Sequence, residues 1–355
     1  MKTWYRRALG VSLVMALISL VAYIAWAAVI EGSKGNDTLI GDQNDPGNGE
    51  ADTIRGFDGN DTLDGRKLDD WISGGGGHDR IIGGEGNDTI TGDSGNDVID
   101  GDDRETDIAF VGHDVIRGGS GNDVIFGGRG NDVLFGDDGD DEIYGGYAGD
   151  EKNAGNNRIF GGLGNDNILS GDGNDYIDGG LGDDTIRDSK GTNRIFGSFG
   201  NDMITTGDGN DFIDGGPGND FIRDSGGGTA TNPQVIMGGS GNDVIAVTGG
   251  TNIIIPGPGL DEVILGATTT TTRGTTGNAH TILIYPGDVP ALRTEFIPCQ
   301  SGVTIKFIGF PPNASIPVTS GTTKNTTTQL VTDPKTKGTY LINVTDTTGC
   351  TITRS

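Results

Sequence analysis

The stretch Gly83-Gly84-Glu85-Gly86-Asn87-Asp88-Thr89-Ile90-Thr91 decides how this chain folds, because close copies of it recur between Gly32 and Ile264. One copy begins at Gly118 and reads GGSGNDVIF, and another begins at Gly215 and reads GGPGNDFIR. Each copy ends in three residues with a large aliphatic at the centre. Such a segment is too short for a helix and is rich in β-branched residues. We therefore expect one short strand per copy, with a single side chain pointing inward.

The aliphatic residues recur every nine positions, as at Ile81, Ile90 and Ile99. One inward side chain per strand gives a thin core, which becomes continuous only when successive turns stack. Between strands, glycines at the first, second and fourth places of the repeat permit positive φ and bring backbone carbonyls close together. This regular spacing predicts an all-β solenoid and argues against the alternative of a disordered, glycine-rich acidic linker.

The aspartate at the sixth place of the repeat points to a metal. Stacked strands lie about 4.8 Å apart, so these aspartates would form a ladder of like charges that repel one another and resist desolvation. Calcium accepts carboxylate and carbonyl oxygens in a flexible geometry, whereas magnesium keeps its waters. Zinc prefers His or Cys ligands, and the repeats contain only His78 and His113. The predicted calcium ligands are Asp37, Asp61, Asp79, Asp88, Asp97, Asp123, Asp132, Asp141, Asp166, Asp175, Asp184, Asp202, Asp211, Asp220, Asp243 and Asp261.

This pattern, glycine-rich and ending in Asp-x-aliphatic-x, resembles the calcium-binding nonapeptide of the RTX (repeats-in-toxin) family of hemolysin-type repeat proteins. The resemblance covers residues 31–265 and implies a right-handed parallel β-roll that binds multiple calcium ions. It also implies that two nonapeptides make one turn. When the copies are counted from Gly32, the odd and the even copies therefore form two separate rows. About eleven turns at about 4.8 Å each would give a rod near 50 Å long.

The two rows differ in sequence. Every odd copy keeps Gly-x-Asp at places four to six, whereas the even row departs from it at every fourth copy overall. Leu68 replaces the fourth-place glycine in one such copy, and others carry Asn157, Asn193 or Gln234 in place of the sixth-place aspartate; a further even copy near the end carries Asn252. Extra residues fall in the same series of every fourth copy, at 101–112, 145–155 and 224–233. We infer that one row binds calcium continuously and that the other row is interrupted at every second copy along it. The alternative is decay of the repeat, with longer loops merely tolerated on the surface.

The charge of the chain is concentrated in the repeats. The whole chain has 51 acidic and 24 basic side chains and a formal net charge of −27. Only four of the acids lie after residue 265, and none lies in the first thirty residues. Such an acidic surface makes nucleic acid and anionic membranes poor partners.

The N-terminal segment resembles an export signal. Lys2, Arg6 and Arg7 precede an apolar run, and Ala25-Trp26-Ala27 fits a cleavage site that would define residues 1–27 as a signal peptide. The apolar run is also long enough to serve as an uncleaved anchor. Either interpretation places the repeats outside the cytoplasm, secreted or at the cell surface. Many RTX relatives instead leave through a dedicated exporter that recognises a C-terminal signal.

The C-terminal segment has a different composition. We expect a Thr-rich linker at 266–279, followed at 280–355 by a small β-sandwich-like module with strands at 281–285, 303–308, 339–344 and 351–353. The chain's two cysteines, Cys299 and Cys350, both lie in this module. In an exported chain they favour a disulfide, which a module of this size needs for stability.

The sequence offers little support for catalysis. Its only histidines are His78, His113 and His280, so no His-Glu-x-x-His motif exists, and no Gly-x-Ser-x-Gly motif occurs. We predict a secreted, non-enzymatic protein that folds on binding extracellular calcium and has a structural or adhesive role. Its candidate partners are a cell-surface glycan, an envelope layer or another copy of the chain, and no small-molecule substrate is expected. The alternative is a calcium-dependent polysaccharide lyase or epimerase on a β-helical coil.

Overall fold

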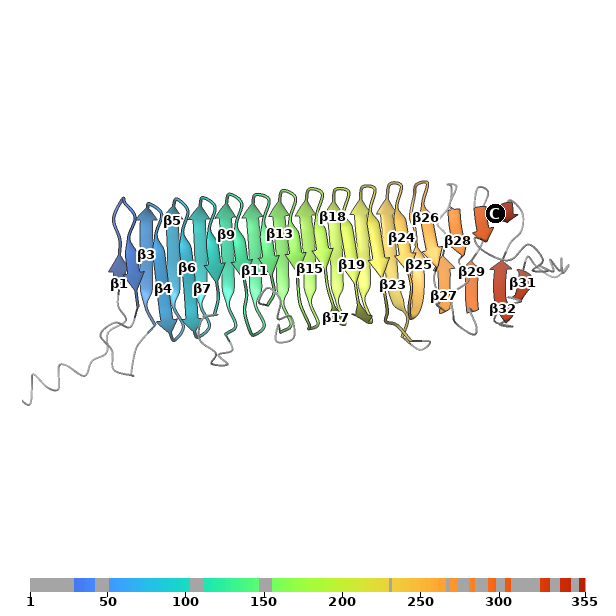
Figure 1. The fold of residues 1–355 in the computed structure, drawn as a ribbon, viewed down its shortest axis with the longest axis horizontal. Coiled ribbons are helices and arrows are strands. Elements are labelled where there is room, and N and C mark those ends of the chain that lie inside the picture. The colour runs from blue at the N-terminus through green and yellow to red at the C-terminus, as the bar shows by residue number, and fades with distance from the viewer. Residues whose placement is uncertain are drawn as a thin grey trace, which may run out of the picture.

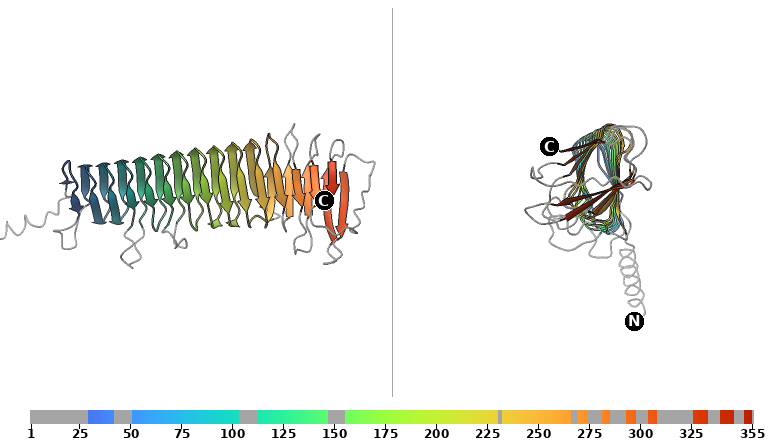
Figure 2. Two further views of the ribbon diagram at one scale, coloured as in Figure 1. Left: turned by 45° about the horizontal axis from the view of Figure 1, so that its top comes forward. Right: turned by 90° about the vertical axis from the view of Figure 1, so that its right-hand side faces the viewer.

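The computed structural model describes residues 29–41, 51–102, 112–146, 155–229 and 232–265, together with strands between residues 269 and 354. The described residues wind into a long coil in which two parallel sheets face each other (Figure 1). Seen end-on, the coil is a flattened tube, because each turn contributes one strand to each sheet (Figure 2). The predicted all-β parallel roll is therefore confirmed.

Sheet A contains 16 strands and sheet B contains 15 among the described residues. In spatial order, sheet A consists of β1 (Val29–Glu31), β3 (Thr53–Asp58), β5 (Trp71–Gly76), β7 (Thr89–Ser94), β9 (Val115–Ser120), β11 (Val133–Asp138), β13 (Arg158–Leu163), β15 (Tyr176–Leu181), β18 (Arg194–Phe199), β21 (Phe212–Pro217), β23 (Gln234–Ser240), β25 (Thr251–Ile255), β27 (Thr269–Arg273), β29 (Arg293–Ile297), β32 (Thr339–Thr345) and β31 (Thr326–Thr332). Sheet B consists of β2 (Thr38–Ile40), β4 (Thr62–Lys67), β6 (Arg80–Glu85), β8 (Val98–Asp100), β10 (Val124–Phe126), β12 (Glu142–Tyr144), β14 (Asn167–Leu169), β16 (Thr185–Arg187), β19 (Met203–Thr206), β22 (Phe221–Asp224), β24 (Val244–Val247), β26 (Glu262–Leu265), β28 (Thr281–Ile284), β30 (Thr304–Phe307) and β33 (Thr351–Arg354). Two short strands, β17 (Lys190–Gly191) and β20 (Asp208–Gly209), pair with each other at one edge.

The strand register shows how many repeats make one turn. In sheet A, Ile54 pairs with Ile72 and Ile72 pairs with Ile90, so that neighbouring strands are 18 residues apart. Sheet B has the same spacing between Leu63 and Ile81. Two nonapeptides therefore make one turn, as the resemblance implied. Odd copies turn from sheet A to sheet B and form the odd edge of the coil, and even copies turn back and form the even edge.

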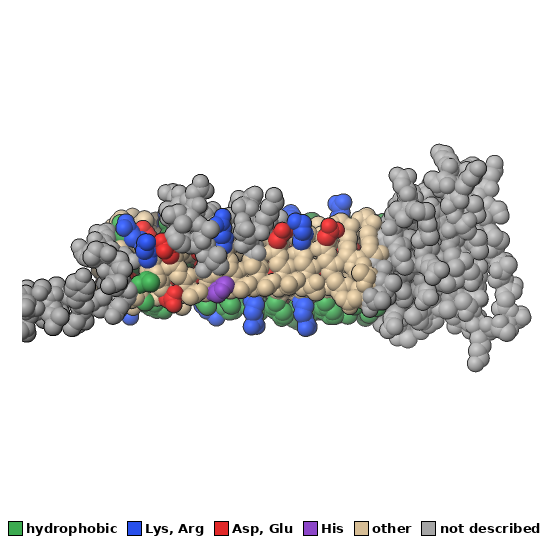
Figure 3. Space-filling model, turned by 90° about the horizontal axis from the view of Figure 1, so that it is seen from below, with side chains coloured by type: hydrophobic (Ala, Val, Ile, Leu, Met, Phe, Trp, Pro, Cys, Tyr) green, Lys and Arg blue, Asp and Glu red, His purple; other side chains and the backbone are tan. Residues whose placement is uncertain are grey.

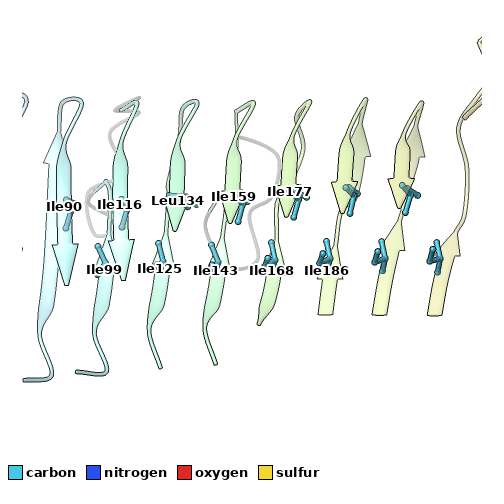
Figure 4. Close-up of a cluster of buried hydrophobic side chains, with 14 of the residues drawn as sticks. Ile90, Ile99, Ile116, Ile125, Leu134, Ile143, Ile159, Ile168, Ile177 and Ile186 are labelled. Carbon is cyan, nitrogen blue, oxygen red and sulfur yellow. The ribbon is translucent and has the colours of Figure 1, made fainter. Parts of the chain in front are cut away.

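The core consists of two rows of aliphatic side chains, one from each sheet, that meet inside the coil (Figure 4). Ile177 and Ile186 are typical, since each is 0% exposed to solvent. Burying such a side chain contributes about 1.5–3 kcal/mol, and no single turn encloses it without the turns above and below. The core is therefore stable only as a stack.

The fifth place of the repeat carries a second ladder of hydrogen bonds. The Asn201 side-chain Oδ1 accepts the Asn219 backbone N–H from the next odd turn at 2.9 Å. The two lone histidines occupy this place: the Asn96 N–H donates to His78 Nδ1 and the Asn131 N–H donates to His113 Nδ1. Each turn thus accepts hydrogen bonds from backbone N–H groups that would otherwise lose their partners when the turns stack.

The C-terminal strands differ from the expected linker and separate sandwich. Strand β27 lies inside the expected linker and pairs in parallel with β25, and β28 to β30 continue both sheets in the same way. Among the strands that the structure describes, β31 alone is antiparallel, to β32. The strands expected near 281, 303, 339 and 351 are present as β28, β30, β32 and β33. The physical reason for the difference is that the last turn of the roll leaves unpaired strand edges, which following β-prone segments can extend.

Several expectations fall outside the described residues. These are the signal peptide at 1–27, the two cysteines and most of the inserted loops. Among the described residues, none belongs to a helix that is long and apolar enough to cross a membrane.

Candidate metal centre

The predicted ligands of the odd row lie directly above one another along the odd edge. In each pair the backbone N–H of one aspartate donates to the Oδ1 atom of the aspartate one turn further along, at 2.7–3.0 Å. The row brings together Asp37, Asp61, Asp79, Asp97, Asp123, Asp141, Asp166, Asp184, Asp202, Asp220, Asp243 and Asp261. From Asp61 onward each Oδ1 therefore accepts a backbone hydrogen bond, which leaves Oδ2 to face elsewhere.

The even row has the same ladder and contains residues that the sequence analysis missed. Its predicted members are Asp88, Asp132, Asp175 and Asp211, which lie on the row at 2.7–2.9 Å from their neighbours. Asp52, Asp70 and Asp114 also belong to it, because the Asp52 N–H donates to Asp70 Oδ1 and the Asp114 N–H donates to Asp132 Oδ1.

The sequence contains a signal for Asp114, whereas Asp70 is explained by the backbone at Leu68. Asp114 follows an insertion that hides its register, although Gly112-His113-Asp114 keeps the ending of the repeat. Leu68 adopts a φ of 74° in place of the usual glycine, so the turn keeps its shape and Asp70 keeps its place on the row. The expectation that Leu68 breaks the even row is therefore wrong.

The second carboxylate oxygen of these aspartates is buried without a hydrogen-bond donor. This holds among the described residues for the Oδ2 atoms of Asp61, Asp79, Asp88, Asp97, Asp114, Asp123, Asp132, Asp141, Asp166, Asp175, Asp184, Asp202, Asp211, Asp220 and Asp243. A buried carboxylate oxygen without a partner is strongly unfavourable. A long row of them requires a compensating positive charge.

The glycine at the first place forms the other wall of each hollow. A Cβ atom added at Gly74 would lie 2.4 Å from Asp79 Oδ2 and 2.8 Å from the carbonyl oxygen of Gly92 in the next turn. At Gly179 the corresponding atoms are Asp184 Oδ2 at 2.4 Å and the Gly197 carbonyl oxygen at 2.8 Å. Only a residue without a side chain leaves this space open. We call this hollow, bounded by the first-place glycine, the sixth-place Oδ2 and the next carbonyl, a cradle.

The electrostatics of the rows favour the binding of a cation. Burial raises the pKa of Asp97 to about 7 and that of Asp184 to about 8, although the hydrogen bond from the preceding backbone N–H lowers both. Burial raises the pKa of Asp114 further, to about 9, and the neighbouring carboxylates of Asp132 and Asp88 add to the effect. A bound cation removes this cost, because it favours the ionised form.

The donor set fits calcium. Each cradle offers a carboxylate oxygen and carbonyl oxygens, which a hard cation with flexible coordination prefers. No group of three or more His, Cys, Asp or Glu side chains converges within the described residues, so a site that needs a side-chain cage is not what these turns offer. Backbone carbonyls must supply much of the coordination, which suits calcium better than zinc.

A parallel coil whose edges carry stacked carboxylate and carbonyl cradles defines a calcium-binding β-roll. The sequence matches the family described as RTX calcium-binding nonapeptide repeat (4 copies) over residues 28–45, 47–72, 73–103, 109–143, 153–186, 189–222 and 234–263. Because these matches cover more than half of the chain, the protein belongs to the RTX calcium-binding nonapeptide repeat family. No match to a curated protein was found.

Proposed function

We propose that this protein is an exported, non-catalytic repeat protein whose roll folds when it binds extracellular calcium. The observation that carries the proposal is the odd row, where buried Oδ2 atoms recur turn after turn from Asp61 to Asp243 beside carbonyl oxygens. Without a cation these turns repel one another and enclose only a thin core. With calcium, binding and folding become one equilibrium. The site residues of the proposal are the predicted aspartates together with Asp52, Asp70 and Asp114.

Extracellular calcium modules bind at roughly 10⁻⁴–10⁻³ M. A chain of this kind would remain unfolded where calcium is scarce and fold after export. The signal-like segment before the repeats supports export, and the acidic repeats suit an unfolded state before it. The resulting long, straight coil (Figure 1) supports a structural or adhesive role at a cell surface.

A calcium titration followed by far-UV circular dichroism tests the proposal, with magnesium as the control. We expect a cooperative gain of β-structure at sub-millimolar to millimolar calcium and none with magnesium. A chain that is fully folded in a chelator at neutral pH would contradict calcium-driven folding.

A further inference from the structure

The residue type at the first place of the repeat changes along the even edge of the coil after Gly145. Before it, the first place of every described even copy is glycine, as at Gly83, and a Cβ there would meet the Asp88 Oδ2 atom at 2.4 Å. From residue 170 onward the first places of the even row are no longer glycine. They are Ser170, Asp188, Thr206, Asp224 and Val247, and each lies at the end of a sheet B strand or directly after one. On the odd edge the first place stays glycine through Gly238.

These side chains occupy the position that the glycines leave empty. All five are buried, with Ser170, Asp224 and Val247 at 0% exposure, Thr206 at 1% and Asp188 at 5%. Because a Cβ at this place lies against the sixth-place carboxylate and the next carbonyl, any side chain here fills the cradle. Figure 3 views the molecule from this edge, which carries β17 in Figure 1, and shows a central band of uncharged side chains and backbone.

Hydrogen bonds between protein groups hold several of these first-place side chains. The Ser170 hydroxyl donates to Asp188 Oδ1 at 2.7 Å, and the Asn193 side-chain N–H donates to Asp188 Oδ2 at 2.7 Å. Two turns further along the same edge, the Thr206 hydroxyl donates to Asp224 Oδ1 at 3.1 Å.

In the turn of Gly145, where the first place is still glycine, the Asn157 side-chain amide lies in the hollow. Its N–H donates to the Gly145 carbonyl oxygen at 3.2 Å. The same amide nitrogen lies 2.6 Å from the position of a Cβ on Gly145. The amide therefore occupies the place of a cation beside that carbonyl.

The turn of Asp188 shows that the carboxylate has been moved rather than lost. A normal copy has glycine at the first place and aspartate at the sixth, whereas this copy has aspartate at the first place and asparagine at the sixth, as Asp188 and Asn193. The aspartate now lies inside its own cradle, held by a hydroxyl and an amide. The turn keeps one carboxyl group but has no room for a metal.

We infer that the even edge from Gly145 to Asn252 binds no calcium, because the Asn157 amide or a buried first-place side chain fills each hollow of this stretch. Calcium is then confined to the even edge before Gly145 and to the odd edge through the turn of Gly238, because the buried Pro256 occupies the first place of the last odd turn. The inference rests on the proposed calcium function and specifies which cradles serve it. It removes Asp175, Asp211 and Asp261 from the calcium ligands, although the Oδ2 atoms of Asp175 and Asp211 are buried without a hydrogen-bond donor. It also replaces an even row that is interrupted at every second turn by one that is interrupted at every turn from Gly145 onward.

A charge-neutral swap tests the inference. In the full chain, the double variant D188G/N193D restores glycine and aspartate to their usual places in one even turn. We expect this variant to bind at least one more calcium ion per chain than the wild type, measured by equilibrium dialysis with elemental analysis. The reverse swap on the odd edge, G179D/D184N, is the matched control and should bind fewer ions. An unchanged count in a folded D188G/N193D variant would overturn the inference.

The single variant D188N gives a second measurement that does not depend on the swap folding. It keeps a side chain in the cradle, so the calcium count should equal that of the wild type, and a lower count would show that Asp188 is itself a ligand and overturn the inference. A wild-type chain that binds no calcium at all would instead contradict the proposed function. Circular dichroism in saturating calcium confirms that each variant is folded before ions are counted.

Discussion

The two edges of the coil are built from the same nonapeptide and have the same backbone ladder, but they solve the problem of stacked carboxylates differently. On the odd edge, Asp184 faces a hollow kept open by Gly179, and its Oδ2 atom has no donor among the described residues. On the even edge, Asp188 fills the corresponding hollow and accepts two hydrogen bonds. One edge therefore keeps its hollows open beside carboxylate oxygens, whereas the other fills them with its own side chains. A β-roll need not be uniformly dependent on calcium.

The largest expected effect is that of acid on the calcium-free chain. Burial raises the pKa of Asp123 to about 7 and that of Asp184 to about 8, from an ordinary value of 3.8. Because the folded-state pKa is higher, the folded chain binds more protons between about pH 4 and pH 8. The resulting stabilisation is complete below about pH 4 and is lost as the pH rises through about 8. In a chelator we therefore expect more β-structure and a higher Tm at pH 5 than at pH 8.

Acid should also protonate Asp188 on the even edge, because burial raises its pKa to about 8 as well. The difference in charge between the two edges should therefore become smaller at low pH. Calcium binding near pH 7 should release protons, because the metal requires ionised ligands. Circular dichroism melts between pH 4 and pH 9 in a chelator measure the first effect. Binding heats in buffers of different ionisation enthalpy measure the second. Greater stability of the calcium-free chain at pH 8 than at pH 5 would show that the rows do not carry the predicted charge cost.

The next effect compares alanine at the first place on the two edges. G179A puts a methyl group 2.4 Å from Asp184 Oδ2 and 2.8 Å from the Gly197 carbonyl oxygen, which are the oxygens proposed to bind calcium. We expect it to lower the free energy of unfolding in calcium by about 3–5 kcal/mol, as breaking a buried charge pair does. T206A removes the hydroxyl that donates to Asp224 Oδ1 and a methyl group, which costs about 1–2 kcal/mol.

Denaturant unfolding at saturating calcium measures both variants, and a calcium titration separates them further. G179A should need more calcium to fold, whereas the calcium requirement of T206A should match that of the wild type. Equal losses of stability and equal calcium requirements would indicate that the first place has the same role on both edges.

Much of the fold follows from the repeat alone. The nine-residue spacing of residues such as Ile90 and Ile99 defines short strands, and the 18-residue register follows once two copies make a turn. The fate of the C-terminal strands does not follow from the sequence. Alternating segments such as Thr281–Ile284 form strands equally well in a sandwich or on the open end of a coil, and only the pairing decides between them.

The odd row could also be predicted from the sequence, whereas the chemistry of the even row could not. Serine, threonine and aspartate are ordinary turn residues, so Ser170 and Asp188 give no warning in the sequence. Their importance appears only when the structure shows that a Cβ at the first place lies against the ligand oxygens. The substitution Asn193 was visible, but the matching aspartate five residues earlier needed the structure to explain it.

Substitutions in the core, which should have a smaller effect, test whether the difference between the edges extends into the two sheets. Ile177 in sheet A and Ile186 in sheet B are both 0% exposed and lie in equivalent rows of the core (Figure 4). I177V and I186V should each cost about 0.5–1.5 kcal/mol, and the two costs should agree because both side chains fill the same kind of space. Denaturant melts of the two variants measure the difference. A clearly larger cost in one sheet would show that the asymmetry extends into the core.

The smallest effect concerns the outer faces of the two sheets. On sheet A, Phe160, Tyr176, Phe196 and Phe212 form a row with ring centroids 5.6–5.7 Å apart, and the Arg194 guanidinium lies 5.6 Å from the Phe212 ring. Because Arg194 is exposed, R194A should cost only about 0.5–1 kcal/mol through the lost cation–π contact.

The matched control is R187A on sheet B, where Arg187 donates to Asn167 Oδ1 at 3.0 Å instead of lying over a ring. This hydrogen bond is exposed, so we expect a smaller loss for R187A than for R194A and no change in calcium requirement for either. Thermal melts at saturating calcium and at two salt concentrations measure both variants. A change in calcium requirement for R194A would mean that the outer face of sheet A is coupled to the edges, so that the two edges could no longer be treated as independent of the sheets between them.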